Sequence, residues 1–171
     1  MAGAAITTPM IPVEPQGLAK RQVAIKSAEV INNGDLVAID TSKKVVAASK
    51  TTGAIVKALW IAYFIDEHGM ATSRTGNAAG TIKTGLCKKC RLKSANSTLV
   101  PSLDEGLPVF LGPVPTSTVS NYTCARSTTA GDKIEQVGSV EEDGTTLEID
   151  LTGAFTELLH QAAATSTAIY G

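Results

Sequence analysis

Apolar and polar positions alternate most clearly near the end of residues 129–151. The apolar positions are Leu147, Ile149 and Leu151, and the polar positions beside them are Thr146, Glu148 and Asp150. Successive side chains of a strand point to opposite faces of a sheet. The alternation therefore predicts a strand with one buried and one solvated face.

A turn signal and a second β-prone run precede this strand, so we predict a β-hairpin. Asp143-Gly144 suits a tight turn that requires positive φ. Residues 133–140 supply the partner strand, and Gly138 interrupts their alternation. Such an interruption indicates a β-bulge.

Short strands separated by turns are expected over most of the preceding chain. The segments are 22–48, 54–66, 81–92, 107–111 and 122–126, with a loop expected over 67–80. The segment 54–66 is the most apolar of them and contains the only tryptophan. Its length permits a helix, but its β-branched and aromatic residues favour a buried strand.

The periodicity changes after the hairpin. Apolar residues recur there at helical spacing, at Phe155, Leu158, Leu159, Ala162 and Ala163. This spacing places them on one face of a helix, which we predict over roughly residues 153–165. The pattern thus predicts a mainly β chain with one C-terminal α-helix.

The first residues are expected to form an extended arm, because prolines at positions 9, 12 and 15 exclude a helix or a central strand. One interpretation is a disordered leader, and the other is an arm that docks on a partner. The apolar side chains that favour docking are Ile6, Met10, Ile11 and Val13. The expected organisation is an arm over 1–21, a β-rich domain over 22–152, and a helix and tail over 153–171.

Composition removes several classes of function. Fifteen basic and sixteen acidic residues leave a formal charge of −1, so no global field draws the chain to nucleic acid or an anionic membrane. No apolar run approaches the roughly 20 residues of a membrane span. The N-terminus lacks the pattern of a signal peptide, so we expect a cytoplasmic chain whose three cysteines are reduced.

Candidate chemistry is sparse. Cys87 and Cys90 form a CxxC motif, which can hold a metal, but a second ligand pair is missing, and buried free thiols are the expected alternative. His68 and His160 have no nucleophile in a recognisable motif beside them. No phosphate-binding glycine motif is present. We expect no catalytic residue, no bound metal and no cofactor.

Basic residues crowd the expected strand over 81–92 and include Lys88, Lys89 and Arg91. One interpretation is an ordinary solvated strand face. The other is a contact patch for an acidic partner surface, to which these three residues are assigned.

The order of several short motifs resembles the small capsid decoration (cement) proteins of tailed bacteriophages. The motifs are Gly34-Asp35-Leu36-Val37, Gly131-Asp132, Val137-Gly138-Ser139-Val140, Asp143-Gly144 and the strand from Leu147 to Leu151. The resemblance covers roughly residues 22–152, so it says nothing of the arm or of the C-terminal segment.

The resemblance implies a compact β-barrel or β-sandwich subunit, often a homotrimer, on the outer surface of a mature icosahedral head. Such a subunit binds the major capsid protein, bridges adjacent capsid subunits and contacts neither nucleic acid nor membrane. It would be made in the host cytoplasm and end in the virion. Two alternatives stay open, namely a small trimeric β-barrel enzyme and a virion module that binds a receptor or glycan.

Overall fold

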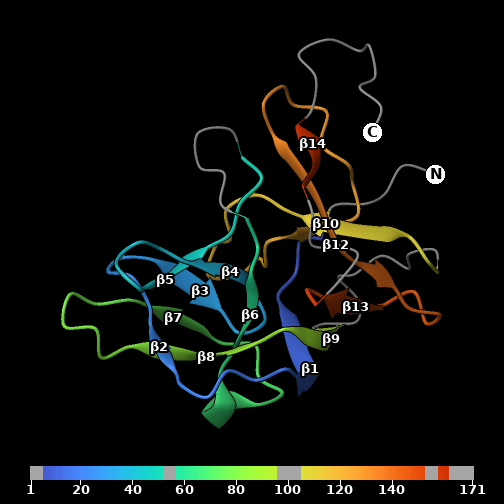
Figure 1. The fold of residues 1–171 in the computed structure, drawn as a ribbon. Helices are drawn as coiled ribbons and strands as arrows, with labels where there is room; N and C mark the ends of the chain where they lie inside the picture. Colours follow the sequence, from blue (N-terminus) through green and yellow to red (C-terminus); the bar gives the residue numbers. More distant parts are fainter. Residues whose placement is uncertain (1–5, 52–56, 96–104, 153–157, 162–171) are drawn as a thin grey trace.

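The protein is mainly β. A computed structural model describes residues 6–51, 57–95 and 105–152, together with the backbone of residues 158–161. Within these residues the strands belong to one large curled sheet, a second sheet and a short two-stranded ribbon (Figure 1). The described helical structure is a single 3-10 turn at Ile65–Glu67.

The large sheet has seven strands, all paired antiparallel. Its order is β1 (Met10–Gln16), β9 (Lys89–Ser94), β13 (Thr146–Asp150), β12 (Lys133–Val140), β10 (Pro108–Leu111) and β11 (Tyr122–Thr123), and β14 (Leu158–Gln161) pairs with β12 outside this path.

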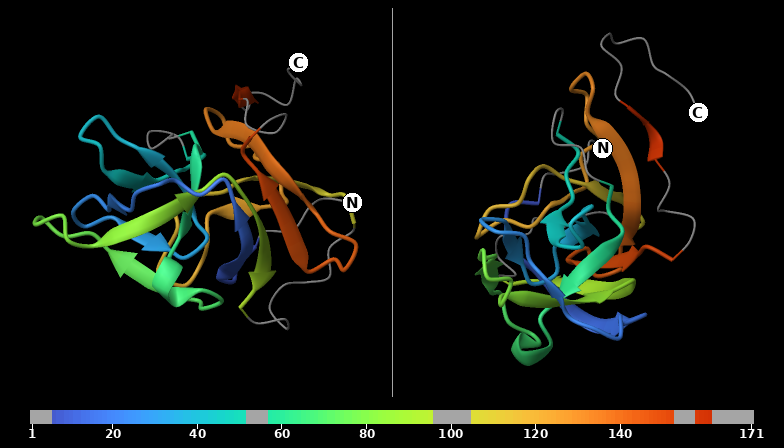
Figure 2. Two further views of the ribbon diagram at one scale, coloured as in Figure 1. Left: turned by 60° about the horizontal axis from the view of Figure 1, so that its bottom comes forward. Right: turned by 60° about the vertical axis from the view of Figure 1, so that its left-hand side comes forward.

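The second sheet has five strands, and a ribbon of two strands accompanies it. Its order is β2 (Val23–Ala24), β8 (Lys83–Cys87), β6 (Trp60–Tyr63), β4 (Leu36–Ile39) and β5 (Val45–Ala47), and the ribbon pairs β3 (Val30–Asn32) with β7 (Ser73–Thr75). Figure 2 shows the five-stranded sheet on one side of the molecule and the β12–β13 hairpin on the other.

One short stretch of chain passes directly from the five-stranded sheet into the seven-stranded sheet. The predicted strand over 81–92 is in fact two strands, because the chain leaves the five-stranded sheet after Cys87 and enters the seven-stranded sheet at Lys89. Lys88 is the residue at the break, and β8 runs into β9 there (Figure 1).

Apolar residues of the five-stranded sheet supply two cores. Leu36 and Ile61 belong to the main core, which they share with strands of the seven-stranded sheet. Val37 and Ala62, on the opposite face, belong to a second core with Phe64. A strand buried on both faces reads as a continuous apolar run. This explains why the segment around β6 is so apolar, and the predicted buried strand is confirmed there over Trp60–Tyr63.

The predicted hairpin is confirmed. Leu147 and Ile149 of β13 are fully buried, and Val140 pairs with Leu147 across the turn. The expected bulge lies beside Gly138, because β10 pairs with Gly138 and then with Gln136. A Cβ at position 138 would lie 2.0 Å from the carbonyl oxygen of Glu148, so only glycine fits.

One residue of the hairpin departs from the predicted alternation. Thr146 is buried, not solvated. The Asp143 carboxylate accepts hydrogen bonds from the Thr146 hydroxyl at 2.6 Å and from the Thr145 and Thr146 amides at 2.8 and 2.7 Å. These bonds, the Thr146 hydroxyl first, lower the pKa of Asp143 to about 2. The turn thus folds Thr146 inward.

The predicted C-terminal helix is wrong at residues 158–161, which form β14. β12 extends beyond its other partners, since β13 pairs with residues 138–140 and β10 with residues 136–139. The Lys133 amide donates to the Lys50 carbonyl at 3.0 Å, and β14 pairs with residues 133–135 along this extension. The rest of the predicted helix, including Phe155, Ala162 and Ala163, lies outside the described residues.

The expected arm contributes a strand to the domain itself. Residues 10–16 form β1 at the edge of the seven-stranded sheet, paired with β9. Pro12 and Pro15 lie in this strand, and an edge is where a sheet tolerates residues without an amide donor. The described part of the arm therefore packs on its own chain.

A cluster of buried polar residues, which we call the polar junction, connects the two large sheets; its members are Asn32, Asp35, Asn121 and Tyr122. Asn121 accepts from the Leu36 amide at 2.8 Å and donates to the Leu36 and Ala48 carbonyls at 2.7 and 2.9 Å. The Tyr122 hydroxyl donates to the Gly34 carbonyl at 2.7 Å. Asp35 accepts two bonds from Asn32, at 2.8 and 3.0 Å.

Candidate functional site

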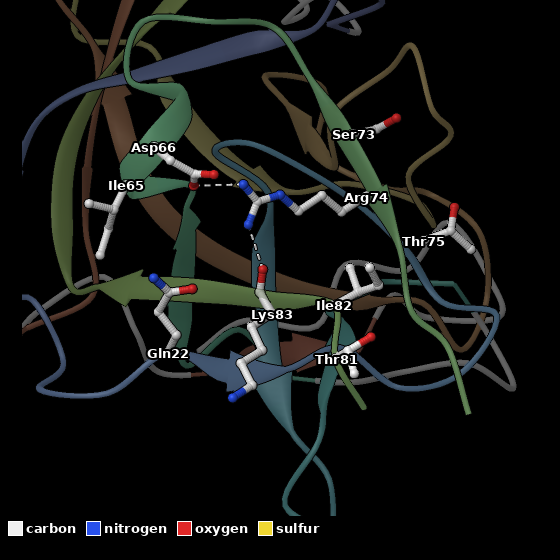
Figure 3. A pocket seen from close by; sticks show the side chains of 9 residues that line it. All are labelled: Gln22, Ile65, Asp66, Ser73, Arg74, Thr75, Thr81, Ile82 and Lys83. Atoms are coloured by element: carbon white, nitrogen blue, oxygen red, sulfur yellow. Dashed lines mark hydrogen bonds and ion pairs between the residues drawn. The ribbon is translucent and has the colours of Figure 1, made fainter. Parts of the chain in front are cut away.

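An open polar cleft lies between the ribbon and the five-stranded sheet (Figure 3). Its volume is about 700 Å³. The lining residues are Gln22, Ile65, Asp66, Ser73, Arg74, Thr75, Thr81, Ile82 and Lys83. Strands β7 and β8 and the 3-10 turn supply most of them.

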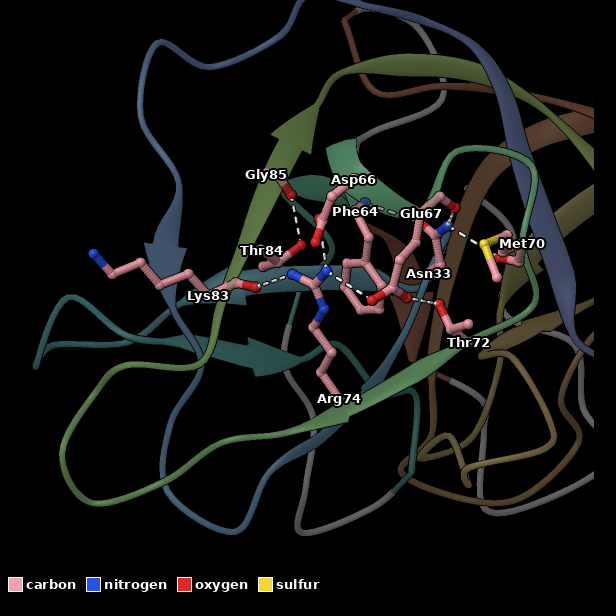
Figure 4. Close-up of polar contacts among 10 residues, drawn as sticks. All are labelled: Asn33, Phe64, Asp66, Glu67, Met70, Thr72, Arg74, Lys83, Thr84 and Gly85. Carbon is pink, nitrogen blue, oxygen red and sulfur yellow. Dashed lines mark hydrogen bonds and ion pairs between the residues drawn. The ribbon is translucent and has the colours of Figure 1, made fainter.

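Arg74 lies at the centre of this cleft, and its guanidinium is already engaged (Figure 4). It donates to the Lys83 carbonyl at 2.6 Å, to Asp66 at 2.7 Å and to Glu67 at 3.0 Å. Its cationic group also stacks over the Phe64 ring, 4.1 Å from the centroid. Arg74 thus fastens β7 to β8 and to the 3-10 turn, which is a structural task.

The acidic partners of Arg74 are held in the charged state. The Thr72 hydroxyl donates to Glu67, and this bond together with Arg74 lowers the pKa of Glu67. The nearest imidazole, His68, shares a hydrogen bond of 2.8 Å with the Tyr63 hydroxyl. The cleft therefore presents the hydroxyl groups of its lining residues in a fixed arrangement. Among the contacts of the described residues, none places a base against these hydroxyl groups.

The cysteines are free and buried, as the second interpretation of the CxxC motif expected. Cys87 and Cys90 both belong to the main core, and the hydrogen bond between their side chains raises the pKa of Cys90. Burial raises the pKa of Cys124 to about 11. Among the described residues, no group of three or more His, Cys, Asp or Glu side chains could hold a metal ion.

Two residues of the predicted basic patch are paired with carboxylates. Lys89 lies 3.0 Å from Glu148 and 3.8 Å from Asp150 on β13. Arg91 donates through Nε to Glu141 at 2.6 Å and lies 3.6 Å from Glu14. These carboxylates, Glu148 and Glu141 first, raise the pKa of Lys89 and Arg91. Their charge is thus largely balanced within the chain.

Lys88, the third residue of that patch, lies elsewhere. Its ammonium group sits over the Trp60 ring, 3.9 Å from the centroid, and donates to the Leu59 carbonyl. Partial burial lowers the pKa of Lys88. The structure therefore separates Lys88 from Lys89 and Arg91 and places it at a different surface.

Trp60, the residue that Lys88 contacts, also lines a shallow groove of about 390 Å³ on the five-stranded sheet, which we call the Trp60 groove. Its lining residues are Ala19, Lys20, Arg21, Val23, Ile39, Lys43, Trp60 and Leu86. Val23, Leu86, Trp60 and Ile39 come from the neighbouring strands β2, β8, β6 and β4, and the register places them on one face.

The Trp60 groove is the uncovered continuation of the second core. Ala19, Val23, Ile39 and Trp60 pack against that core while remaining partly exposed. Leu18 and Leu59, which precede groove residues in the chain, are 52% and 40% exposed. A groove whose apolar floor is partly exposed is a candidate interaction site.

The predicted contact residues of the arm divide into two pairs. Ile6 and Met10 are buried at 5% and 0% exposure and belong to the main core. Ile11 and Val13, on the same stretch, are only partly buried. Ile6 and Met10 thus stabilise their own chain, and Ile11 and Val13 keep surface that a partner can reach.

Reasoning from the sequence missed the Trp60 groove. Its residues come from four strands and two loops, so no local sequence motif predicts the groove. The available signals were the single tryptophan and the adjacent Lys20-Arg21 pair.

Comparison with known proteins gives no relative: no protein-family model, no curated protein and no solved structure matches the chain. Over the residues it describes, the structure contains no helix with the length and apolarity that crossing a bilayer requires.

Proposed function

We propose that the chain is a structural virion protein that decorates the outer surface of a mature tailed-phage head. It binds the major capsid protein and bridges adjacent capsid subunits, which stabilises the shell against the pressure of packaged DNA. Many copies, each adding a modest interface, stabilise a shell strongly, because binding favours the state to which the copies bind.

The motifs that carry the resemblance support this proposal through their structural roles. Asp35 precedes β4 and is buried in the polar junction. Asp132 precedes β12, is also buried, and lies 2.6 Å from the Lys50 ammonium. Both Gly-Asp motifs therefore hold the start of a strand by buried polar contacts, which suits a mechanical role.

The main structural support for the proposal is the Trp60 groove. It is an apolar sheet face, continuous with a core, that ends in solvent among exposed cations. A protein whose work is attachment needs such a surface. In the same proposal, the curled sheet belongs to a compact β-barrel or β-sandwich subunit that assembles as a homotrimer.

Co-sedimentation with undecorated heads of the phage that encodes the protein tests the proposal. Binding should saturate at a fixed ratio of protein to capsid subunit, and decorated heads should survive heating or chelation longer than bare heads. Bovine serum albumin at equal concentration controls for nonspecific trapping. Absence of saturable binding, with no gain in survival, would contradict the proposal.

A further inference from the structure

The Trp60 groove combines an apolar floor with a one-sided electrostatic rim. Lys20 and Arg21 come from the connection between β1 and β2, and Lys43 comes from the turn between β4 and β5. All three are exposed, and no acidic residue is among those that line the groove. The whole chain, in contrast, carries a formal charge of −1. The rim is therefore a local concentration of positive charge on a nearly neutral protein.

The apolar floor and the basic rim of the groove favour different chemical groups of a bound ligand. Trp60, Val23 and Ile39 offer apolar area, which an apolar side chain covers with a gain in free energy. The cations favour carboxylates at the edges and disfavour a basic segment. Lys88 contacts the Trp60 ring but is not among the residues that line the groove. A purely polyanionic ligand would leave the floor uncovered.

We propose that the Trp60 groove binds a segment of a partner protein that has an apolar centre flanked by Asp or Glu side chains. The inference rests on the proposed function, in which that segment belongs to the major capsid protein. The apolar centre covers Trp60, and the flanking carboxylates pair with Lys20 and Lys43.

Trp60 provides the readout, because it is the only tryptophan of the chain. The full-length protein is titrated at low salt with a short synthetic peptide that has a Leu-Phe-Leu centre flanked by Glu and Asp. A second peptide replaces the acids with Lys, a third replaces the apolar centre with Ser, and a single-stranded oligonucleotide provides charge without apolar side chains. Emission from Trp60 should shift to shorter wavelength with the first peptide only.

The variant Lys20→Glu/Lys43→Glu should weaken binding of the acidic peptide by about tenfold or more. Lys83→Glu/Lys93→Glu is the matched control, because it changes net charge equally at two exposed lysines outside the groove. The control should bind like the wild type. Equal affinity for the acidic and basic peptides, tighter binding of the oligonucleotide, or an unaffected groove variant would overturn the inference.

Undecorated heads separate this inference from the proposed function. Heads that bind the wild type and the groove variant equally would overturn the inference and leave the proposed function standing. Heads that bind neither protein, while the acidic peptide still binds the wild type, would overturn the proposed function and leave the chemistry of the groove in place.

Discussion

At the scale of single residues, Asp35 links protonation to stability. Its carboxyl is fully buried in the polar junction, where two bonds from Asn32 satisfy only one of its oxygens. Burial raises its pKa from 3.8 to about 7. At pH values between 3.8 and about 7, the folded protein therefore keeps a proton on Asp35 that the unfolded chain has lost.

The sign of the resulting pH dependence follows from linkage. The contribution of Asp35 to stability is greatest below its ordinary pKa of 3.8 and is lost as pH rises through about 7, a change on the order of 4 kcal/mol. Asp35→Asn removes the titration, so its free energy of unfolding should decline less across this interval. Urea unfolding at a series of pH values measures the slope.

Asp143→Asn is the control for Asp35→Asn. The pKa of Asp143 is lowered from 3.8 to about 2 in the folded state, so above about pH 5 this group is ionised in both the folded and the unfolded chain. Its variant should keep the wild-type slope between about pH 5 and pH 7. A slope that is unchanged in Asp35→Asn would show that another group carries the dependence.

At the scale of secondary-structure elements, β13 tests the hairpin. Ile149 is fully buried in the main core, whereas Glu148 faces the other way and pairs with Lys89 near the surface. Ile149→Ala should lower the free energy of unfolding by about 2–5 kcal/mol. Glu148→Ala should cost about 1 kcal/mol or less. Comparable losses, measured by chemical denaturation, would place the strand in a different register.

The edge strand β1 gives a second comparison. Met10 is fully buried, and its neighbour Ile11 is only partly buried. Met10→Ala should cost about 2–5 kcal/mol, and Ile11→Ala roughly half of that or less. If both variants lowered the melting temperature equally and only slightly, residues 10–16 would not be packed as an edge strand and would instead form a free arm.

The sequence predicted those elements whose signals are local. The hairpin combines alternation with Asp143-Gly144, and Gly138 marks the bulge where a Cβ would strike the neighbouring strand. The split at Lys88 gave no local signal, because it depends on which sheet each half joins. The local spacing of apolar residues around β14 is helical, and the pairing with residues 133–135 that makes it a strand is a contact between distant parts of the chain.

At the scale of the whole molecule, the same distinction explains the candidate site. The Trp60 groove exists only because β2, β8, β6 and β4 lie side by side, and the ribbon covers one part of their common face and leaves another exposed. The sequence alone assigned Lys88, Lys89 and Arg91 to one patch, but the change of sheet at Lys88 separates them. The order of strands in the sheets determines which side chains lie together on the surface, and local sequence patterns do not specify that order.

The proposed function places the protein on the outer face of phage heads, and electron microscopy of particles from infected cells tests this placement. Heads purified without added protein would be labelled with gold-conjugated antibody against the folded chain, and heads of a mutant phage that lacks the gene would serve as the control. We predict label on the outer face of filled heads and none on the mutant heads. Heads without label, with the protein recovered only in the particle-free fraction, would overturn the proposed location on the head.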